Sequence, residues 1–212
     1  MTILPLTYLG HTDYFAALLG DECVIDLGEH YVKQSYRNRC EILSAGGVVP
    51  LTVNVVKGGS LRKQPMRGMR IDYSKRWQHQ QWMAIVSAYR SAPFFDHYAD
   101  RFEPFFGQRY EFLADLNTAL LEPLLPLLGA TRPLRFSDTY LIPAEGDRDL
   151  RGAFEPLPSA PDGTLLSGTA AYEPYDQVFA DRFPFAPCLS VLDLLFCEGP
   201  AAGDLLRRHT LR

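Results

Sequence analysis

The sequence predicts an α/β fold: a single domain with a partly parallel mixed sheet, a strand–helix–strand start and a helical middle section. Strands and helices alternate over the first 30 residues, and the hydrophobic period then becomes helical over a long central stretch. A chain of 212 residues can bury one full core, so we expect residues 1–212 to form one domain. An α+β arrangement is the alternative.

The N-terminal elements form the expected βαβ start. Residues 2–9 form an apolar run typical of a buried strand, and residues 11–20 carry apolar side chains at helical spacing before a terminal glycine. Residues 22–29 are too short and too apolar for a helix and predict the second strand. Residues 39–59 follow as a hairpin, because a Gly-Gly pair separates two runs rich in Ile, Leu and Val.

Helices are expected through most of the remaining chain. Apolar residues at helical spacing predict helices over 77–92, 94–106, 110–129 and 189–209. Pro123 and Pro126 should shorten or kink the third of these, and Gly199-Pro200 should break the last by a turn. Residues 133–142 predict a further strand. The polar stretch 143–163, rich in Pro and Gly, predicts a surface loop.

Positive charge is concentrated in one segment of an acidic chain. Residues 33–76 carry a net charge of +8, whereas the remainder carries −12. Such a segment favours an anionic small-molecule ligand, although most of its cations would equally serve to keep hairpins soluble. Nucleic acid is not the expected partner, because few aromatic residues are interleaved with the cations and no nucleic-acid-binding motif is present.

Several classes of protein are disfavoured by missing patterns. The N-terminus lacks a basic region, and no window has the roughly 18 uncharged apolar residues of a membrane span, so we expect a cytoplasmic protein with no transmembrane segment. The four cysteines show no CxxC pair and no His at ligand spacing, so no metal site or disulfide framework is predicted. Common nucleotide-binding and hydrolase motifs are absent. No motif indicates a cofactor or an oligomeric state.

The stretch from Lys33 to Arg39 is the predicted phosphate-binding site. Arginine presents a planar fork that matches phosphate oxygens, so Arg37 and Arg39 around Asn38 read as a clamp, with Lys33 and Tyr36 beside it. The alternative is a structural arginine that pairs with Asp26 or Glu29, which lie close in the sequence. Residues Tyr8 and Trp77 are further candidates for contacts with a sugar, although aromatic stripes are more often core.

Asp13 and His79 are the candidate catalytic residues. Asp13 lies in the first strand–helix–strand unit, near the strand ends where open α/β sheets bind ligands. His79 lies between two tryptophans of the central helical stretch. The structural alternatives are an acid that favours a helix N-terminus, for Asp13, and a surface histidine, for His79.

Five stretches in order resemble the WbqC-like family of bacterial proteins, in the compact form common in the Bacteroidetes. These stretches are YLGHTDYFAALL, VIDLGEHYVKQSYRNRCEI, IDYSKRWQHQQWMAIVSAYRSAPFFDHY, FLADLNTALL and YDQVFADRFPFAPCLSVLDLLFCEGP. The resemblance covers about residues 4–200. It implies a bacterial cytosolic protein linked to gene clusters for O-antigen and other surface polysaccharides, and some members are labelled as transferases that attach glycine to an amino sugar.

The chain departs from the family pattern at several positions. Longer members carry His-Gln where this chain has Leu4 and Pro5, and often a His where it has Gln81. The Asn-Arg pair is retained as Asn38-Arg39, whereas the segment before Ser167-Gly168 is shortened. If either family His were catalytic, this chain would have lost it, or His11 and His79 would have to substitute for it.

Two functions follow as hypotheses. The first is a transferase of surface polysaccharide biosynthesis that acts on a nucleotide-linked or lipid-linked amino sugar, with aminoacyl (glycyl) transfer as one form of the reaction. In it, Arg37 and Arg39 hold phosphate, Asn38 bonds a sugar or acyl carbonyl, and Asp13 or His79 takes a proton from the attacking amine. The alternative is a non-catalytic binding or assembly protein for an anionic ligand or a protein partner.

Overall fold

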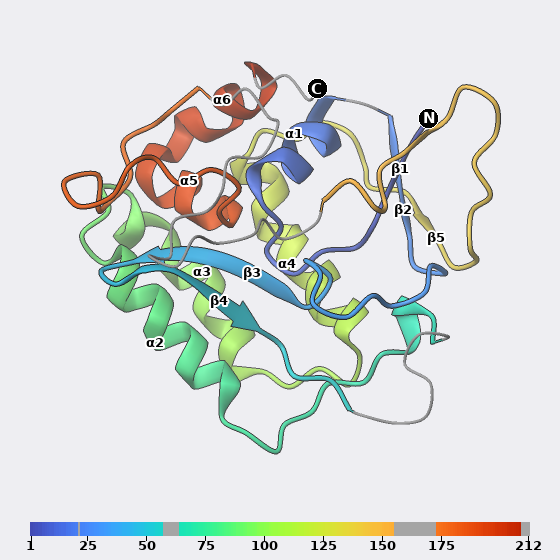
Figure 1. Ribbon diagram of the computed structural model, residues 1–212, viewed down its shortest axis with the longest axis horizontal. Coiled ribbons are helices and arrows are strands. Elements are labelled where there is room, and N and C mark those ends of the chain that lie inside the picture. The colour runs from blue at the N-terminus through green and yellow to red at the C-terminus, as the bar shows by residue number, and fades with distance from the viewer. Residues whose placement is uncertain (21, 57–63, 155–172, 209–212) are drawn as a thin grey trace.

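A small parallel sheet forms one side of the molecule (Figure 1). The computed structural model describes residues 1–20, 22–56, 64–154 and 173–208. The sheet has the order β5-β2-β1-β6, and its three strand pairs are all parallel. Its strands are β1 (Thr2–Leu4), β2 (Cys23–Asp26), β5 (Phe136–Ser137) and β6 (Arg148–Asp149). The α/β prediction is therefore confirmed.

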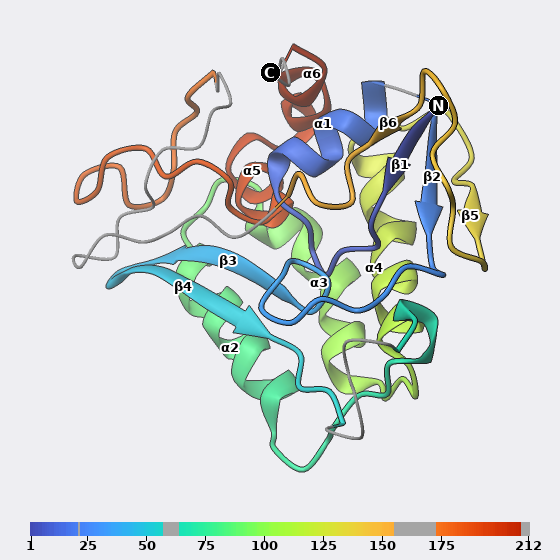
Figure 2. The same cartoon turned by 45° about the vertical axis from the view of Figure 1, so that its right-hand side comes forward.

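The predicted βαβ start is present, with shorter strands than expected. β1 ends at Leu4, and the next residue, Pro5, has no N–H to donate to a neighbouring strand. Helix α1 (Thr12–Gly20) carries the chain back, and β2 pairs in parallel with β1. The carboxyl ends of β1 and β2 consequently lie at the same edge of the sheet (Figure 2).

The predicted hairpin is a separate two-stranded antiparallel ribbon rather than part of the parallel sheet. It consists of β3 (Arg39–Ser44) and β4 (Gly47–Thr52), joined by a two-residue turn. Gly47 has a φ of 103°, a conformation that favours glycine. Arg39 begins β3, as the sequence predicts, and it pairs with Thr52 at the last position of β4.

The helical middle section consists of three helices, α2 (Trp77–Tyr89), α3 (Phe95–Gly107) and α4 (Leu113–Leu127). α2 packs on β3 and on α3, and α3 packs on α4. A short 3-10 turn, η2 (Met66–Gly68), also packs on α4. α4 continues through both prolines to Leu127, so they do not shorten it.

The last elements of the described chain are α5 (Val191–Glu198), the 3-10 turn η3 (Gly199–Ala201) and α6 (Ala202–Arg208). The break at Gly199-Pro200 agrees with the sequence. Gly199 has a φ of 54°, and a Cβ there would lie 2.4 Å from the ring of Phe94, so only glycine fits this turn. α5 and α6 both contact α1. The two ends of the described chain therefore pack against each other.

The surface loop predicted for residues 143–163 contains a strand: residues 143–146 are exposed, and β6 follows at Arg148–Asp149. Within that stretch, Arg148 and Leu150 donate their N–H groups to Met1 and Ile3, so β6 extends the sheet beside β1. Leu150, Arg151 and Phe154 are buried. A two-residue strand is too short to show a hydrophobic period, which is why the sequence did not indicate it. Residues 155–163 and Ser167-Gly168 lie outside the described residues.

None of the helices in the described part of the chain combines the length and the apolar character needed to cross a membrane.

Candidate functional site

A cleft of about 390 Å³ lies where β3 begins and β4 ends. Three of the predicted phosphate-binding residues, Lys33, Asn38 and Arg39, line it together. The remaining lining residues come from the loop before β3 and from the end of β4 and the segment that follows it: Tyr31, Gln34, Thr52, Val53, Asn54 and Val55. Part of the predicted clamp therefore lines a concave site, because Lys33, Asn38 and Arg39 all face this cleft.

Asn38 holds the two walls of the cleft together. Its side-chain Nδ2 donates to the carbonyl of Val53 (2.8 Å), and its own carbonyl accepts the N–H of Val53 (2.8 Å). These two bonds join the loop before β3 to the segment after β4. Gln34 lies in the same loop with a φ of 58°, an uncommon conformation for a residue other than glycine.

Two buried polar atoms at this cleft have no hydrogen-bond partner among the described residues. They are Oδ1 of Asn38, an acceptor, and Nε of Arg39, a donor. Buried polar groups in folded proteins are nearly always bonded to protein or to water. Both atoms belong to residues that line the cleft, so the site has unused hydrogen-bonding capacity next to its positive charge.

The two arginines of the clamp point in different directions. Arg39 is 27% exposed and pairs through Nη2 with Glu41 (2.7 Å), a carboxylate that is almost fully buried. Arg37 is buried and forms a bidentate pair with Glu29, with Nε to Oε1 at 2.8 Å and Nη2 to Oε2 at 2.6 Å. Burial raises the pKa of Glu29, and the hydrogen bonds from Arg37 oppose that shift. Arg37 is therefore the structural arginine of the alternative interpretation, in which an arginine of this stretch pairs with Asp26 or Glu29.

The pair of Arg37 and Glu29 belongs to a larger buried ion network. Arg37 Nη2 also donates to the carbonyl of Arg151 (3.0 Å). The guanidinium of Arg151 bonds Asp26 through Nη1 (2.6 Å) and Asp149 through Nη2 (2.6 Å). This network ties the loop before β3 to the end of β2 and to β6.

The predicted aromatic contacts are buried as well. Tyr8 donates its hydroxyl to Oε1 of Gln81 (2.6 Å), and Nε2 of Gln81 donates to the carbonyl of Thr52 on the cleft wall (2.8 Å). Burial raises the pKa of Tyr8. Trp77 is buried at the start of α2 and donates Nε1 to the carbonyl of Asp72 (3.1 Å). Tyr8 thus supports the cleft wall through Gln81, and neither Tyr8 nor Trp77 lines the cleft.

A buried chain of contacts leads from the cleft to the candidate base Asp13. Glu41, the partner of Arg39, accepts the hydroxyl of Tyr36 (3.1 Å). Burial, with a smaller contribution from Glu41, raises the pKa of Tyr36, so its hydroxyl stays protonated. The ring of Tyr36 lies 4.7 Å from that of His11, whose Nδ1 accepts the N–H of Asp13 (3.2 Å). His79, the other candidate base, is exposed on α2 and does not line the cleft.

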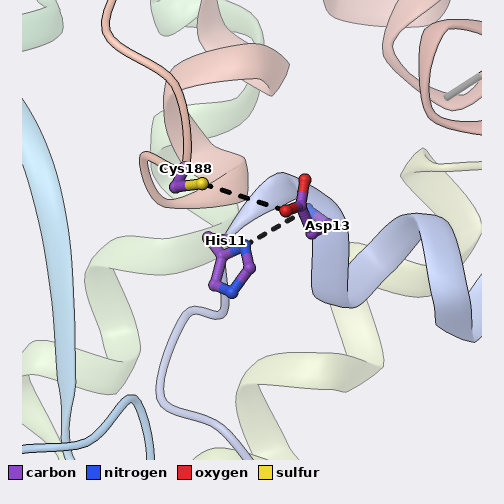
Figure 3. A group of neighbouring side chains, drawn as sticks. All are labelled: His11, Asp13 and Cys188. Carbon is purple, nitrogen blue, oxygen red and sulfur yellow. Dashed lines mark hydrogen bonds between the residues drawn. The ribbon is translucent and has the colours of Figure 1, made fainter. Parts of the chain in front are cut away.

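The sequence did not indicate the group that Asp13 joins. Figure 3 shows His11, Asp13 and Cys188 pointing toward one another, with Sγ of Cys188 3.9 Å from Oδ2 of Asp13. Cys188 is separated from Asp13 by 175 residues and precedes α5, so no spacing rule could connect them. The only available signal was the His-x-Asp pair at the start of α1.

A larger cavity of about 680 Å³ lies elsewhere and holds none of the predicted site residues. It is lined by residues of α1, of the C-terminal end of α4 and of the segment leading to β5. Two of its cations are paired, Arg135 with Glu22 and Arg207 with Asp204. Arg132 is a third cation in its lining, so this cavity is basic as well, and we favour the smaller cleft because it gathers the residues predicted from the sequence.

The sequence from residue 7 to residue 155 matches the WbqC-like protein family. The chain belongs to this family. It is also similar to the uncharacterized protein Rv1507c of Mycobacterium tuberculosis (strain ATCC 25618 / H37Rv), with 27% identity over 229 residues that cover 98% of this chain and 97% of the relative. No solved structure matches the chain. The region matched by the family contains the whole cleft and Asp13, whereas Cys188 lies beyond it.

Proposed function

We propose that this WbqC-like protein is a transferase of bacterial surface polysaccharide biosynthesis whose cleft binds a phosphate-bearing amino sugar. The observation that carries the proposal is the cleft itself, where Lys33 and Arg39 lie beside two buried polar atoms that have no partner in the described protein. A sugar phosphate offers anionic oxygens for the cations, together with hydroxyl and amide groups for Asn38 and Arg39.

The reaction would be transfer of an aminoacyl group, such as glycyl, to the sugar amine. The amine nitrogen attacks the carbonyl carbon of an activated donor, an amide bond forms and the leaving group of the donor departs. A protein base takes the proton that the amine loses. Asp13 and His79 remain the two candidates, and neither lines the cleft: Asp13 is connected to it through Glu41, Tyr36 and His11, whereas His79 lies exposed on α2.

The first experiment is a thermal-shift screen against sugar nucleotides, acyl-CoA compounds and polyprenyl phosphate analogues. A ligand present at 100 times its Kd adds about 2.7 kcal/mol of stability, which is readily detected. Wild type should be stabilised by an amino-sugar compound, and Lys33→Ala and Arg39→Lys should be stabilised less. Arg67→Ala is the matched control, because Arg67 is an exposed cation of the same basic segment that does not line the cleft. Absence of any shift would refute the proposed substrate class.

A turnover assay with purified protein then tests catalysis. If Asp13 or His79 is the base, Asp13→Asn or His79→Gln should lower kcat by about 10²–10⁴-fold while ligand binding is retained.

A non-catalytic binding protein is the second candidate, and Gln81 is the observation in its favour. Gln81 occupies a position where longer members often have His, and both ends of its amide are used in bonds to Tyr8 and Thr52. An amide in this role supports the cleft wall and transfers no proton. Binding of the sugar compound without turnover for any donor would select this function.

A further inference from the structure

Three side chains of different chemistry meet in a buried group formed by the two ends of the described chain. His11 precedes α1, Asp13 lies in its first turn, and Cys188 lies just before α5. One ligand-type atom from each lies within 4.8 Å of the other two. His11 is 3% and Cys188 6% exposed, whereas Asp13 is intermediate in exposure. The group therefore has one side that is closer to solvent.

The backbone on both sides of the group is held in place. The N–H of Val191 donates to the carbonyl of Gly10 (2.9 Å), and the N–H of Ser190 donates to the carbonyl of Glu41 (2.7 Å). Cys188 has a φ of 58°, in the left-handed region that few residues other than glycine adopt. Such conformations persist only where the surrounding structure enforces them, and they cluster at functional sites.

The donor set matches a transition metal rather than Ca²⁺ or Mg²⁺. Thiolate and imidazole are ligands of Zn²⁺ and related ions, and a carboxylate completes many such sites. Two ligands bound at about 2.0–2.3 Å to a tetrahedral ion lie about 3.6 Å apart. The 3.9 Å between Sγ of Cys188 and Oδ2 of Asp13 is close to that value. A cation between these atoms would also offset the negative charge of a thiolate placed beside a carboxylate.

We propose that His11, Asp13 and Cys188 form a divalent metal site whose chemistry favours Zn²⁺. Nδ1 is the imidazole atom that faces Asp13, so it is the ligand atom of His11. Metal binding would replace the 3.2 Å hydrogen bond from the N–H of Asp13 to this nitrogen. Three protein ligands leave a position for water or substrate, which is the arrangement of catalytic rather than structural zinc sites.

The metal site is independent of the proposed sugar-phosphate ligand. A carboxylate that binds a metal does not act as the proton acceptor, so in the metal-bound protein Asp13 is a ligand. Metal binding is measured without substrate, and its failure would therefore leave the cleft unaffected.

The test uses the full chain, with any affinity tag removed, freed of metal by a chelator and titrated with Zn²⁺ or Co²⁺. Wild type should bind one ion per chain, and the Co²⁺ form should show a near-ultraviolet thiolate-to-cobalt charge-transfer band. Cys188→Ser should abolish the band and weaken binding by at least about 10–100-fold, the loss expected even for a residue that only supports a ligand. Cys23→Ser, which changes a cysteine outside the group, should bind as wild type does.

Asp13→Asn provides a second variant, because Asp13 is partly exposed and its replacement by the isosteric amide should preserve the fold. The Asp13→Asn variant should also bind the metal ion more weakly than wild type, while its circular dichroism spectrum matches that of wild type. Absence of stoichiometric binding by wild type would overturn the proposal. Retention of wild-type affinity and of the charge-transfer band in Cys188→Ser would overturn it as well.

Discussion

Two sides of one short loop differ in what their arginines do. On one side, Arg37 is buried against Glu29 and joined through Arg151 to Asp26. On the other side, Arg39 reaches the cleft beside Lys33 and keeps part of its surface in solvent. The first set of charges is fully paired within the protein, whereas the second has an unused donor.

The difference shows that neighbouring residues of one motif can divide between structure and binding. A buried ion pair is expensive to break, because the remaining charge is left without a partner in a medium of low dielectric constant. A cation at a cleft can lose its ligand to water at little cost. Substitutions that remove the charge of Arg37 should therefore change stability, and a substitution that keeps the charge of Arg39 beside the buried Glu41 should change affinity.

The largest effect is expected for Arg37→Ala. It leaves the Glu29 carboxylate buried without its partner, and we expect a loss of about 3–5 kcal/mol in the free energy of unfolding, measured by urea denaturation. Adding Glu29→Gln should recover part of that loss, because a neutral amide is less costly to bury. A loss below about 1 kcal/mol would show that Arg37 is not the structural member of the pair.

Arg39→Lys should act mainly on affinity. Lysine keeps the positive charge beside Glu41 but lacks the planar fork and its Nε–H. We expect the binding free energy of a sugar nucleotide to weaken by about 1.5–3 kcal/mol, the usual size of a charge-assisted hydrogen bond. Isothermal titration calorimetry measures the affinity and urea denaturation the stability. A larger change in the free energy of unfolding than in the binding free energy would show that Arg39, like Arg37, has a structural role.

Lys33→Ala should produce a smaller loss of affinity. Lys33 is exposed, so it contributes one charge at the mouth of the cleft, about 1 kcal/mol at 4 Å in water. This loss should shrink as salt is added, whereas the free energy of unfolding should stay within about 0.5 kcal/mol of wild type. An unchanged affinity at low salt would remove Lys33 from the site.

The smallest effect is expected for the contribution of Asp149, a member of the ion network around Arg151, to the pH dependence of stability. Hydrogen bonds from Arg151 lower the pKa of Asp149 below its usual value. A carboxylate with a lowered folded-state pKa stabilises the protein at neutral pH, and this contribution is lost as the pH falls through that pKa. Asp149→Asn should therefore be less stable than wild type at neutral pH, and the difference should disappear in acid. A difference that persists in acid would show that packing, rather than charge, accounts for the contribution of Asp149.

The sequence predicts the parts of the fold that depend on local periodicity. The alternating start gives β1, α1 and β2, and the Gly-Gly pair gives the β3–β4 hairpin with Arg39 at its first residue. It does not predict β6, because a strand of two residues shows no hydrophobic period. Its pairing partner, β1, is also far away in the sequence.

The candidate site is predictable only where it is local. Lys33, Asn38 and Arg39 lie within seven residues, so their common cleft could be anticipated. The choice between binding and structural roles for Arg37 depends on Glu29 and on the carbonyl of Arg151, which is 114 residues away. Likewise, nothing in the spacing of Cys188 links it to His11. Both outcomes depend on long-range packing.

Arginine side-chain NMR during titration with a uridine-diphosphate amino sugar tests the central claim most directly. The Nε–H signals of Arg37 and Arg39 can be assigned from the Arg37→Lys and Arg39→Lys variants. We predict that the Arg39 signal shifts progressively as its unused donor gains a partner, while the Arg37 signal, already bonded to Glu29, stays unchanged. A shift at Arg37 with none at Arg39 would contradict the division of roles, and no shift at either would contradict binding of this ligand class in the cleft.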